Sequence, residues 1–245
     1  MSNSIEKIDD LGIILAAGGS STRFSGSAGG RSKLLTSFPD IQSEMGLAKF
    51  AALPLFMIPV INFIELCCDE NFVISVKKDD FAKFADAIAE FLPERHPKII
   101  IGGRTRMHSV FNALNELPES AKFAAIHDAA RPFTTKKLFI NCLDAARIHN
   151  GAVTAKRMID TVKLADENGF IIKTVDRSTL WHVETPQIFP TTTLIEAYKK
   201  AFADNLSATD DAGVMEHAGF HPFLFEHTTN NSKITHPRSG GKSDF

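Results

Sequence analysis

Apolar runs alternate with helical patterns along the first half of the chain. Four short runs are apolar at nearly every position, and the first, Gly12–Ala17, is typical of a strand buried on both faces of a sheet. The segment "FAKFADAIAEFL" has helical spacing and ends before Pro93, and apolar residues recur at Val110 and Leu114 after Gly103. This alternation predicts an α/β fold with a doubly wound, mainly parallel sheet. The expected strands are Gly12–Ala17, Phe72–Val76, Lys98–Ile101 and Phe123–His127.

The pattern changes after residue 160. "TVKLA", "DENG" and "FIIKTV" (Thr161–Val175) predict two strands around an Asn-Gly turn. Such a hairpin either covers an edge of its own sheet or projects outward, and the residues leave both arrangements open. A projecting hairpin would expose Ile171, Ile172 and Val175, which a second subunit would have to bury. The elements expected next are a helix over 192–205, a helix capped by Thr209 with Asp210 and Asp211 in its first turn, and a strand over 220–227.

One apolar segment, Phe50–Cys68, is long enough to be considered as a membrane span. Pro54, Pro59, Asn62 and Glu65 interrupt it, and polar or helix-breaking residues are unfavourable in a lipid-spanning helix. The sequence therefore predicts a buried helix initiated by proline, and no association with a membrane.

Composition is that of an ordinary globular protein. The 245 residues are 44% hydrophobic and 23% charged, with a net charge of −2, so there is no global positive field for nucleic acid. Neither a linker nor an internal repeat divides the chain, which predicts a single domain over 1–245 with a disordered tail at 238–245. The three cysteines, Cys67, Cys68 and Cys142, lack the spacing of a disulfide framework or a zinc site and indicate a reducing, cytoplasmic setting.

A loop rich in glycine and serine follows the first strand, and Arg23 and Lys33 lie within it. Ligands of doubly wound sheets bind beyond the carboxyl ends of the strands, where this loop begins. Its glycine spacing matches neither a Walker A loop nor a dinucleotide fingerprint, but exposed backbone N–H groups and two cations suit a polyphosphate. A flexible linker with two solvated bases is the alternative.

Six motifs occur together: "LAAGGSSTRF…SKLL", "GGRTRMHSV", "HDAARPF", "DTVK", "TVDRSTLWHVETPQIF" and "NSKIT". In this order they resemble the 2-C-methyl-D-erythritol 4-phosphate cytidylyltransferases. The resemblance implies a Rossmann-like nucleotidyltransferase that uses Mg²⁺ to transfer CMP from CTP to methylerythritol phosphate, releasing pyrophosphate, in the non-mevalonate isoprenoid pathway. Two alternatives are a cytidylyltransferase for another polyol phosphate, such as ribitol 5-phosphate, and a catalytically silent nucleotide-binding protein.

The implied reaction needs cations more than it needs acids and bases. The attacking group is a phosphate oxygen of the acceptor, already ionised at neutral pH because its second pKa is about 6. Repulsion between this anion and the α-phosphate of CTP is then the main barrier, so catalysis depends on positioning and charge neutralisation.

The resemblance assigns roles residue by residue. The predicted catalytic cations are Arg23, Lys33, Arg177 and Lys233. The predicted triphosphate cradle is Ala16, Ala17, Gly18 and Gly19, and the predicted cytosine and ribose contacts are Gly102, Gly103 and Ser109. The remaining predicted substrate contacts are Asp128, Ala129, Arg131, Thr161 and Thr185. The metal is expected on the CTP phosphates, with Asp128 as the one candidate protein ligand.

Several of these residues have plain structural alternatives. Gly102 and Gly103 would also suit a tight strand-to-helix turn, and Arg131 would also suit an ion pair with Asp128. His127 is expected to be a satisfied buried histidine and not a base. Thr161 and Arg177 flank the hairpin, so the resemblance implies a homodimer in which an arm, about 155–185, completes the partner's pocket.

Overall fold

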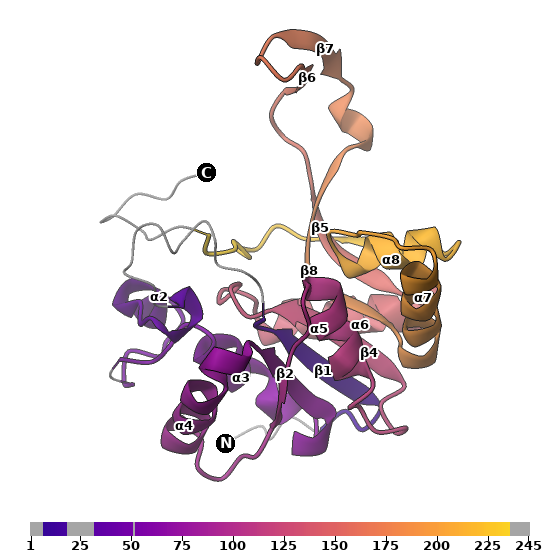
Figure 1. Cartoon of the computed structure of the whole chain (residues 1–245). Coiled ribbons are helices and arrows are strands. Elements are labelled where there is room, and N and C mark those ends of the chain that lie inside the picture. The colour runs from indigo at the N-terminus through magenta and orange to yellow at the C-terminus, as the bar shows by residue number, and fades with distance from the viewer. Residues whose placement is uncertain (1–6, 19–31, 51, 236–245) are drawn as a thin grey trace.

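The computed structural model describes residues 7–18, 32–50 and 52–235 (Figure 1). Within these ranges a seven-stranded sheet has the order β3-β2-β1-β4-β8-β5-β9. β8 is antiparallel to β4 and β5, and the other neighbouring pairs are parallel, which confirms an α/β fold with a mainly parallel sheet. The strands are β1 (Leu11–Ala16), β2 (Phe72–Val76), β3 (Lys98–Ile101), β4 (Phe123–Asp128), β5 (Ala152–Arg157), β8 (Trp181–Pro190) and β9 (Phe223–Glu226).

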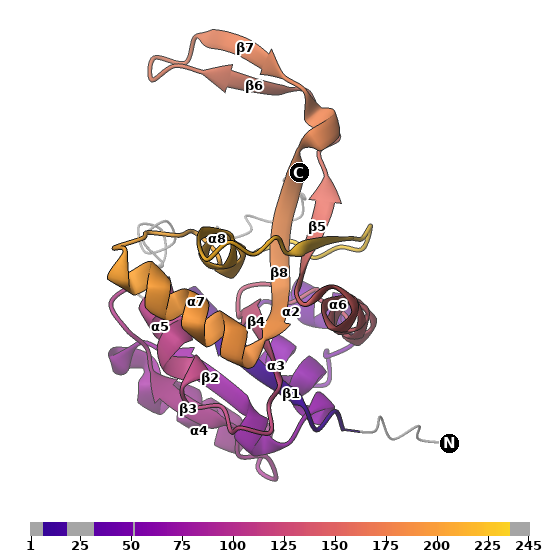
Figure 2. The ribbon, with the colours of Figure 1, turned by 90° about the vertical axis from the view of Figure 1, so that its right-hand side faces the viewer.

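Helices cover both faces of this sheet (Figure 2). Successive side chains of a strand point to opposite faces, so Ile13 packs in one apolar cluster and Ile14 in the other. The first cluster contains residues of α3, α4 and α6, and the second contains residues of α5, α7 and α8. Burial on both faces explains the continuous apolar runs of the central strands. The helices are α2 (Pro39–Glu44), α3 (Met57–Phe63), α4 (Phe81–Phe91), α5 (Arg106–Leu114), α6 (Lys136–His149), α7 (Thr191–Ala203) and α8 (Asp211–His217).

Local sequence patterns predicted the bounds of many of these elements to within one or two residues. β2 and β3 have the predicted bounds, and β4 extends one residue beyond them. β1 begins and ends one residue earlier than predicted, and α7 begins and ends within two residues of the predicted helix. The predicted cap of α8 is wrong, because Asp210 and not Thr209 caps that helix. The Asp210 carboxylate accepts a hydrogen bond from the Gly213 N–H at 3.0 Å, and Asp211 is the first helical residue.

The apolar segment Phe50–Cys68 is not one helix. Only Met57–Phe63 is α-helical, and Ile64–Leu66 continues as a 3₁₀ turn. Pro59 fits at the third position of α3, because the first turn of a helix needs no internal donor. Burial of the segment is as predicted, with Leu53, Phe56 and Phe63 fully inaccessible. Among the described residues no helix combines the length and apolarity that crossing a membrane requires.

The sequence patterns did not predict α2, α6, β5 or β8. The middle of β8 carries Glu184, Pro186 and Gln187, so this strand lacks the apolar run that identified the others. All three are nevertheless buried, because β8 lies inside the sheet between β4 and β5. β8 therefore brings polar side chains into the interior, where they need hydrogen-bonding partners.

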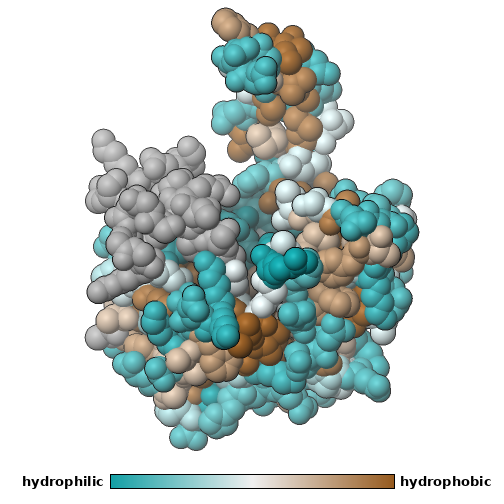
Figure 3. Space-filling model, viewed as in Figure 1, coloured by the Kyte–Doolittle hydropathy of each residue, from teal (hydrophilic) through white to brown (hydrophobic). Residues whose placement is uncertain are grey.

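The predicted hairpin forms a separate two-stranded sheet of β6 (Val162–Ala165) and β7 (Ile171–Val175). Gly169 provides the positive φ of +86° that its turn requires. Of the two arrangements left open by the sequence, the hairpin adopts the projecting one (Figure 1). Phe170, Ile171 and Ile172 are 73%, 65% and 61% exposed, and apolar residues gather on this arm in Figure 3.

Candidate active site

The ends of β1 and β4 form the base of the site. Ala16 lies opposite Asp128 in the parallel register, so both strands end at the same edge of the sheet. Backbone bonds fix the residues that follow, since the Ala129 N–H donates to the Ala16 carbonyl at 3.2 Å and the Ala17 N–H donates to the Ser75 carbonyl at 2.9 Å. Backbone hydrogen bonds therefore fix this edge as far as Ala17. The predicted cradle residue Gly19 and the predicted cation Arg23 lie outside the described residues.

Small residues are sterically required beside this edge. A Cβ atom would lie 3.1 Å from the Ser109 hydroxyl oxygen at Gly18 and 2.6 Å from it at Gly102. At Gly103 it would lie 2.2 Å from the Cβ atom of His108, so the tight strand-to-helix turn considered as an alternative is present. The structure thus brings Gly18, Gly102 and Ser109 together. Their contact with a cytosine or ribose stays a prediction.

Asp128 lies among three cations at the end of β4. Its Oδ2 atom is 2.6 Å from Lys233 Nζ and 4.0 Å from Arg131 Nε, and its Oδ1 atom is 3.5 Å from Arg106 Nε. Burial alone would raise the pKa of Asp128, but Arg106, Lys233 and Arg131 outweigh burial and hold that pKa well below its usual range. The carboxylate is therefore ionised at neutral pH and orients the cations around it.

Arg106 was not singled out from the sequence, although it stands within the motif "GGRTRMHSV". Its Nη2 atom lies 2.7 Å from Oδ2 of Asp211, and the Tyr198 hydroxyl donates to Oδ1 of the same carboxylate at 2.5 Å. Burial by itself lowers the pKa of Arg106, but the carboxylates of Asp211 and Asp128 outweigh burial and raise the pKa overall, so the guanidinium stays charged. Arg106 thereby joins Asp128 to α7 and α8.

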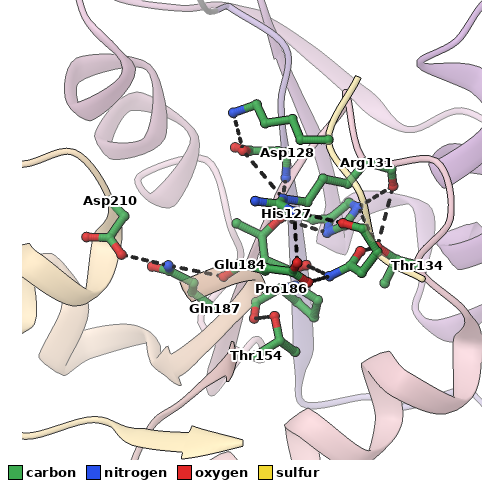
Figure 4. A network of polar contacts seen from close by, with 12 residues as sticks. His127, Asp128, Arg131, Thr134, Thr154, Glu184, Pro186, Gln187 and Asp210 are labelled. Carbon is green, nitrogen blue, oxygen red and sulfur yellow. Dashed lines mark hydrogen bonds and ion pairs between the residues drawn. The ribbon is translucent and has the colours of Figure 1, made fainter. Parts of the chain in front are cut away.

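A second buried carboxylate, Glu184, lies in the same network of polar contacts as Asp128 and Arg131 (Figure 4). Its Oε2 atom accepts hydrogen bonds from Asn231 Nδ2 at 2.7 Å and pairs with His227 Nε2 at 3.0 Å. Its Oε1 atom lies 3.7 Å from Arg131 Nη1 and 3.9 Å from Lys156 Nζ. Burial raises the pKa of Glu184, but these hydrogen bonds and cations outweigh burial and lower the pKa overall. Glu184 therefore stays charged inside the protein.

His127 is a buried structural histidine, as predicted. Its Nδ1 atom lies 3.2 Å from the Thr185 hydroxyl and its Nε2 atom lies 3.2 Å from the Arg131 carbonyl. Burial lowers the pKa of His127 to about 4, so the ring is neutral at physiological pH. Thr185 in turn accepts the Asp128 N–H at 3.0 Å, which places its buried hydroxyl behind Asp128. The substrate contact predicted for Thr185 stays a prediction.

Two predicted catalytic lysines come together from distant parts of the chain. Lys33 Nζ donates to the Ile234 carbonyl at 2.8 Å, across 201 residues of sequence. Ile234 directly follows Lys233, whose ammonium contacts Asp128. Lys33 therefore contacts the residue next to Lys233, and Lys233 contacts Asp128. These three linked residues are called the cluster below.

Thr161 and Arg177, the two predicted site residues that flank the hairpin, lie outside this cluster. Both are exposed, and the Arg177 guanidinium donates to the Ile159 carbonyl within the arm. Figures 1 and 2 show the arm projecting away from the sheet that carries the cluster. The structure of one chain consequently leaves these residues remote from Asp128.

The residues present do not fit a magnesium ion held by the protein. Among the described residues no cluster of three or more histidine, cysteine or acidic side chains could hold a metal. Asp128 is the candidate ligand, but its oxygens already face Lys233 at 2.6 Å and Arg106 at 3.5 Å. A divalent ion at Asp128 would have to compete with these two cations for the carboxylate oxygens.

A small-residue edge beside fixed cations, on a mainly parallel α/β sheet, is the arrangement of an α/β nucleotidyltransferase. A sequence model of one such family, described as 2-C-methyl-D-erythritol 4-phosphate cytidylyltransferase (IspD), matches residues 49–241. The chain belongs to this family.

Individual relatives agree. The 2-C-methyl-D-erythritol 4-phosphate cytidylyltransferase of Actinobacillus pleuropneumoniae is 38% identical over 212 residues, covering 83% of this chain and 92% of that protein. The protein of the same name from Caldanaerobacter subterraneus is 38% identical over 140 residues, covering 57% of this chain and 62% of that protein. The crystal structure of 4-diphosphocytidyl-2C-methyl-D-erythritol synthase from Anaerococcus prevotii has the same fold, with a TM-score of 0.70 at 24% identity over 93% of this chain and 92% of that one.

Proposed function

We propose that this protein transfers CMP from CTP to 2-C-methyl-D-erythritol 4-phosphate, forming 4-diphosphocytidyl-2-C-methyl-D-erythritol and pyrophosphate, a step of isoprenoid biosynthesis. Family membership supports the reaction class and the substrates. The single observation that carries the mechanism is the cluster of Lys33, Lys233 and Asp128 at the small-residue edge of the sheet. Two anions can meet there because cations are fixed in advance.

The reaction balances without a protein nucleophile. An oxygen of the acceptor phosphate attacks the α-phosphorus of CTP and forms the new phosphoanhydride bond. The bond from that phosphorus to the oxygen bridging the α- and β-phosphates breaks, and its electron pair leaves with pyrophosphate. Both attacking and leaving groups are already anionic, so the protein supplies orientation and positive charge instead of proton transfer.

Each charged residue has a distinct part in this proposal. Lys33 neutralises the α-phosphate of CTP, together with Arg23 from the preceding loop. Lys233 holds the acceptor phosphate, and Asp128 keeps the Lys233 ammonium in place until that phosphate arrives. Arg131, which contacts both Asp128 and Glu184, steadies the same region. Charges that are oriented before the substrate binds cost little reorganisation during the reaction.

The nucleoside would occupy the turn between β3 and α5. A Cβ atom at Gly18 or Gly102 would lie 3.1 Å or 2.6 Å from the Ser109 hydroxyl oxygen, so the bare backbone of both glycines passes close to Ser109. Backbone N–H and C=O groups at such a turn can read the edge of a pyrimidine and select it by size. Ala16, Ala17 and Ala129 keep the neighbouring edge small, which lets the triphosphate approach the backbone.

A homodimer completes the site in this proposal. The arm exposes Phe170, Ile171 and Ile172, and a patch of this kind is normally covered by another protein surface. A second subunit that covers the arm would receive Thr161 and Arg177 near its own Lys233. Arg177 would then bind the acceptor phosphate in the partner's pocket.

The proposal also includes Mg²⁺ and a cytoplasmic location. The described residues do not offer the ion a ligand set of their own, so Mg²⁺ is proposed to arrive on the phosphates of CTP, where it supplies charge neutralisation. The three free thiols, of which Cys67 and Cys142 are buried, suit a reducing compartment.

Release of pyrophosphate from CTP tests this function directly. The full-length protein is supplied with CTP, Mg²⁺ and one acceptor at a time: methylerythritol phosphate, ribitol 5-phosphate or none. Release that depends on methylerythritol phosphate is the expected result. A preference for ribitol 5-phosphate would replace the acceptor in this proposal, and no release with either acceptor would overturn it.

A further inference from the structure

The motif "NSKIT" contains a buried polar residue for which the reaction gives no direct use. Asn231 is fully inaccessible, yet it lies on a segment without helix or strand, two residues before Lys233. A segment of this kind has no ladder of backbone hydrogen bonds to hold it, and buried polar groups must be satisfied by specific partners. The position of Lys233 therefore depends on the few contacts that its own segment makes.

Asn231 uses every polar group of its side chain to fasten this segment. Its Nδ2 atom donates to Glu184 Oε2 at 2.7 Å and to the Thr185 carbonyl at 2.9 Å. Its Oδ1 atom accepts from the Thr134 hydroxyl. Its backbone carbonyl accepts from Arg131 Nη1 at 2.8 Å. One side chain thus joins the segment to β8 and to the connection between β4 and α6.

The residues that follow Asn231 connect it to the cluster. Ile234 donates its N–H to the Ala130 carbonyl at 2.8 Å and offers its own carbonyl to Lys33 Nζ, also at 2.8 Å. Lys233 lies between the fixed residues Asn231 and Ile234, and its ammonium reaches Asp128. Displacing Asn231 would accordingly move Lys233. It would also move the Ile234 carbonyl, which is the hydrogen-bond partner of Lys33.

We propose that Asn231 is a positioning residue: by clamping residues 231–234 to Glu184, Thr185 and Thr134, it fixes Lys233 against Asp128 and fixes the Ile234 carbonyl that holds Lys33. This proposal rests on the proposed cytidylyl transfer, because its consequence is the placement of that reaction's cations. Asn231 touches neither substrate in it. The residue acts through the two lysines.

The contacts of Asn231 make Asn231→Asp an informative variant, because it changes the charge of the side chain and not its size. Aspartate has the same size but replaces the donating amide with a carboxylate, which would face Glu184 Oε2 where Asn231 now donates at 2.7 Å. Two carboxylates at this distance repel each other until the pair takes up a proton, which restores an O–H donor in place of the amide. The neighbouring titratable and charged groups, also present in the unmodified protein, are Arg131, Lys156, His182 and His227 around Glu184.

A matched control exists at the opposite end of the sheet. Asn71 is also buried, and its Nδ2 atom donates to the carbonyls of Leu11 and Asp9 at 3.0 Å and 3.3 Å. Asn71→Asp therefore places the same charge in a buried amide site remote from the cluster. Stability loss is expected in both variants, whereas an effect on turnover is expected only at Asn231.

The experiment measures kcat and KM of CTP-dependent pyrophosphate release for both variants and the unmodified protein from pH 8 to pH 6. For Asn231→Asp we expect kcat about a hundredfold below the unmodified protein at pH 8, since a displacement of 1 Å can have that effect. The deficit should shrink about tenfold by pH 6 as the carboxyl pair is protonated. Expressing each value relative to the unmodified protein removes the titration of the acceptor phosphate.

The possible outcomes distinguish a failure of the positioning role from a failure of the proposed function. If Asn231→Asp and Asn71→Asp lose stability alike and turn over equally, the positioning role is wrong. If the unmodified protein releases no pyrophosphate, the proposed function fails instead. Should Asn231→Asp not fold, Thr134→Val removes one hydrogen bond of the clamp without adding charge, and kcat equal to the unmodified enzyme in that variant would overturn the inference.

Discussion

Lys233 Nζ lies 2.6 Å from Asp128 Oδ2, although 105 residues separate the two along the chain. The pair is only partly screened from solvent, with the lysine side chain 40% exposed and the carboxylate 12% exposed. The buried carboxylate is fixed by its position at the end of β4, so it determines where the mobile end of the lysine rests. An entering phosphate would compete for a cation that already points toward the sheet edge.

Removing either lysine of the cluster should impair turnover more than folding. We expect Lys33→Ala and Lys233→Ala each to lower kcat about a hundredfold or more, as does the loss of one preorganised charge contact in other enzymes. Lys122→Ala is the matched control, because that lysine is on the surface and donates to the Glu119 carbonyl. Steady-state kinetics with thermal unfolding as the check on folding would measure this. Near-normal turnover would remove the lysine concerned from the chemistry.

Asp128→Asn should destabilise the protein at neutral pH by ~3 kcal/mol, the order expected when a buried ion pair loses one partner. The pKa of Asp128 is held below its usual value, so its contribution is fully present above the ordinary aspartate pKa of about 3.9. It is lost only as pH falls through the still lower pKa of the folded state. Urea unfolding of both proteins should give a constant difference from pH 8 to pH 5, and a difference that declines within this range would contradict the account.

Mixed dimers test whether the arm acts on the partner. One subunit carries Arg177→Ala and the other Lys233→Ala, and differently tagged subunits are co-expressed and purified as the heterodimer. If Arg177 serves the neighbouring site, one of the two sites in each heterodimer keeps both residues, and about half of the unmodified activity is expected. If Arg177 serves its own subunit, both sites are damaged and activity stays at the level of the single variants.

His127 should make the protein sensitive to mild acid. Burial lowers its pKa to about 4, whereas an exposed histidine has a pKa of about 6.5, so the unfolded state binds the proton first as pH falls. The stability contributed by the neutral ring is therefore complete above pH ~6.5 and is lost progressively down to about pH 4, by roughly 3 kcal/mol. In His127→Gln this part of the pH dependence should be absent. Urea unfolding at pH 7, 6, 5 and 4.5 would measure it, and equal slopes for the two proteins would refute it.

Tyr198→Phe should destabilise the fold by ~2 kcal/mol, because the fully buried Asp211 carboxylate loses a charge-assisted hydrogen bond. Thr154→Val is the comparison, since the Thr154 hydroxyl is buried but donates at 3.2 Å to the neutral Pro186 carbonyl. A smaller loss, ~1 kcal/mol, is expected there. Chemical denaturation measures both, and equal losses would show that the charge on Asp211 does not matter.

The sequence pattern predicted the structure best where one local rule decided it. The bounds of β2 and β3 follow from apolar runs, and the β6–β7 turn follows from Asn-Gly. It failed where a partner distant in sequence compensates for an unfavourable residue. β8 was missed because Glu184 interrupts its apolar pattern, and the Asn231 and His227 contacts that make Glu184 tolerable inside the sheet come from another part of the chain.

The candidate site divides in the same way. Motifs identified Lys33, Asp128 and Lys233 as single residues, but no local pattern places a lysine beside a carboxylate 105 residues away. Arg106 and Asn231 stand inside quoted motifs and were still overlooked, since their importance lies in their partners and not in their type.

The sequence alone determined the class of fold, the projecting hairpin's turn and the chemical character of the site, because hydrophobic periodicity, turn residues and local charge act over a few neighbouring residues. Tertiary structure decided which side chains meet. Buried charge is tolerable only with partners, and packing around β8 supplied Glu184 with its partners and set the position of Lys233. These hydrogen bonds and ion pairs between distant residues bring the side chains of separate motifs together at one site.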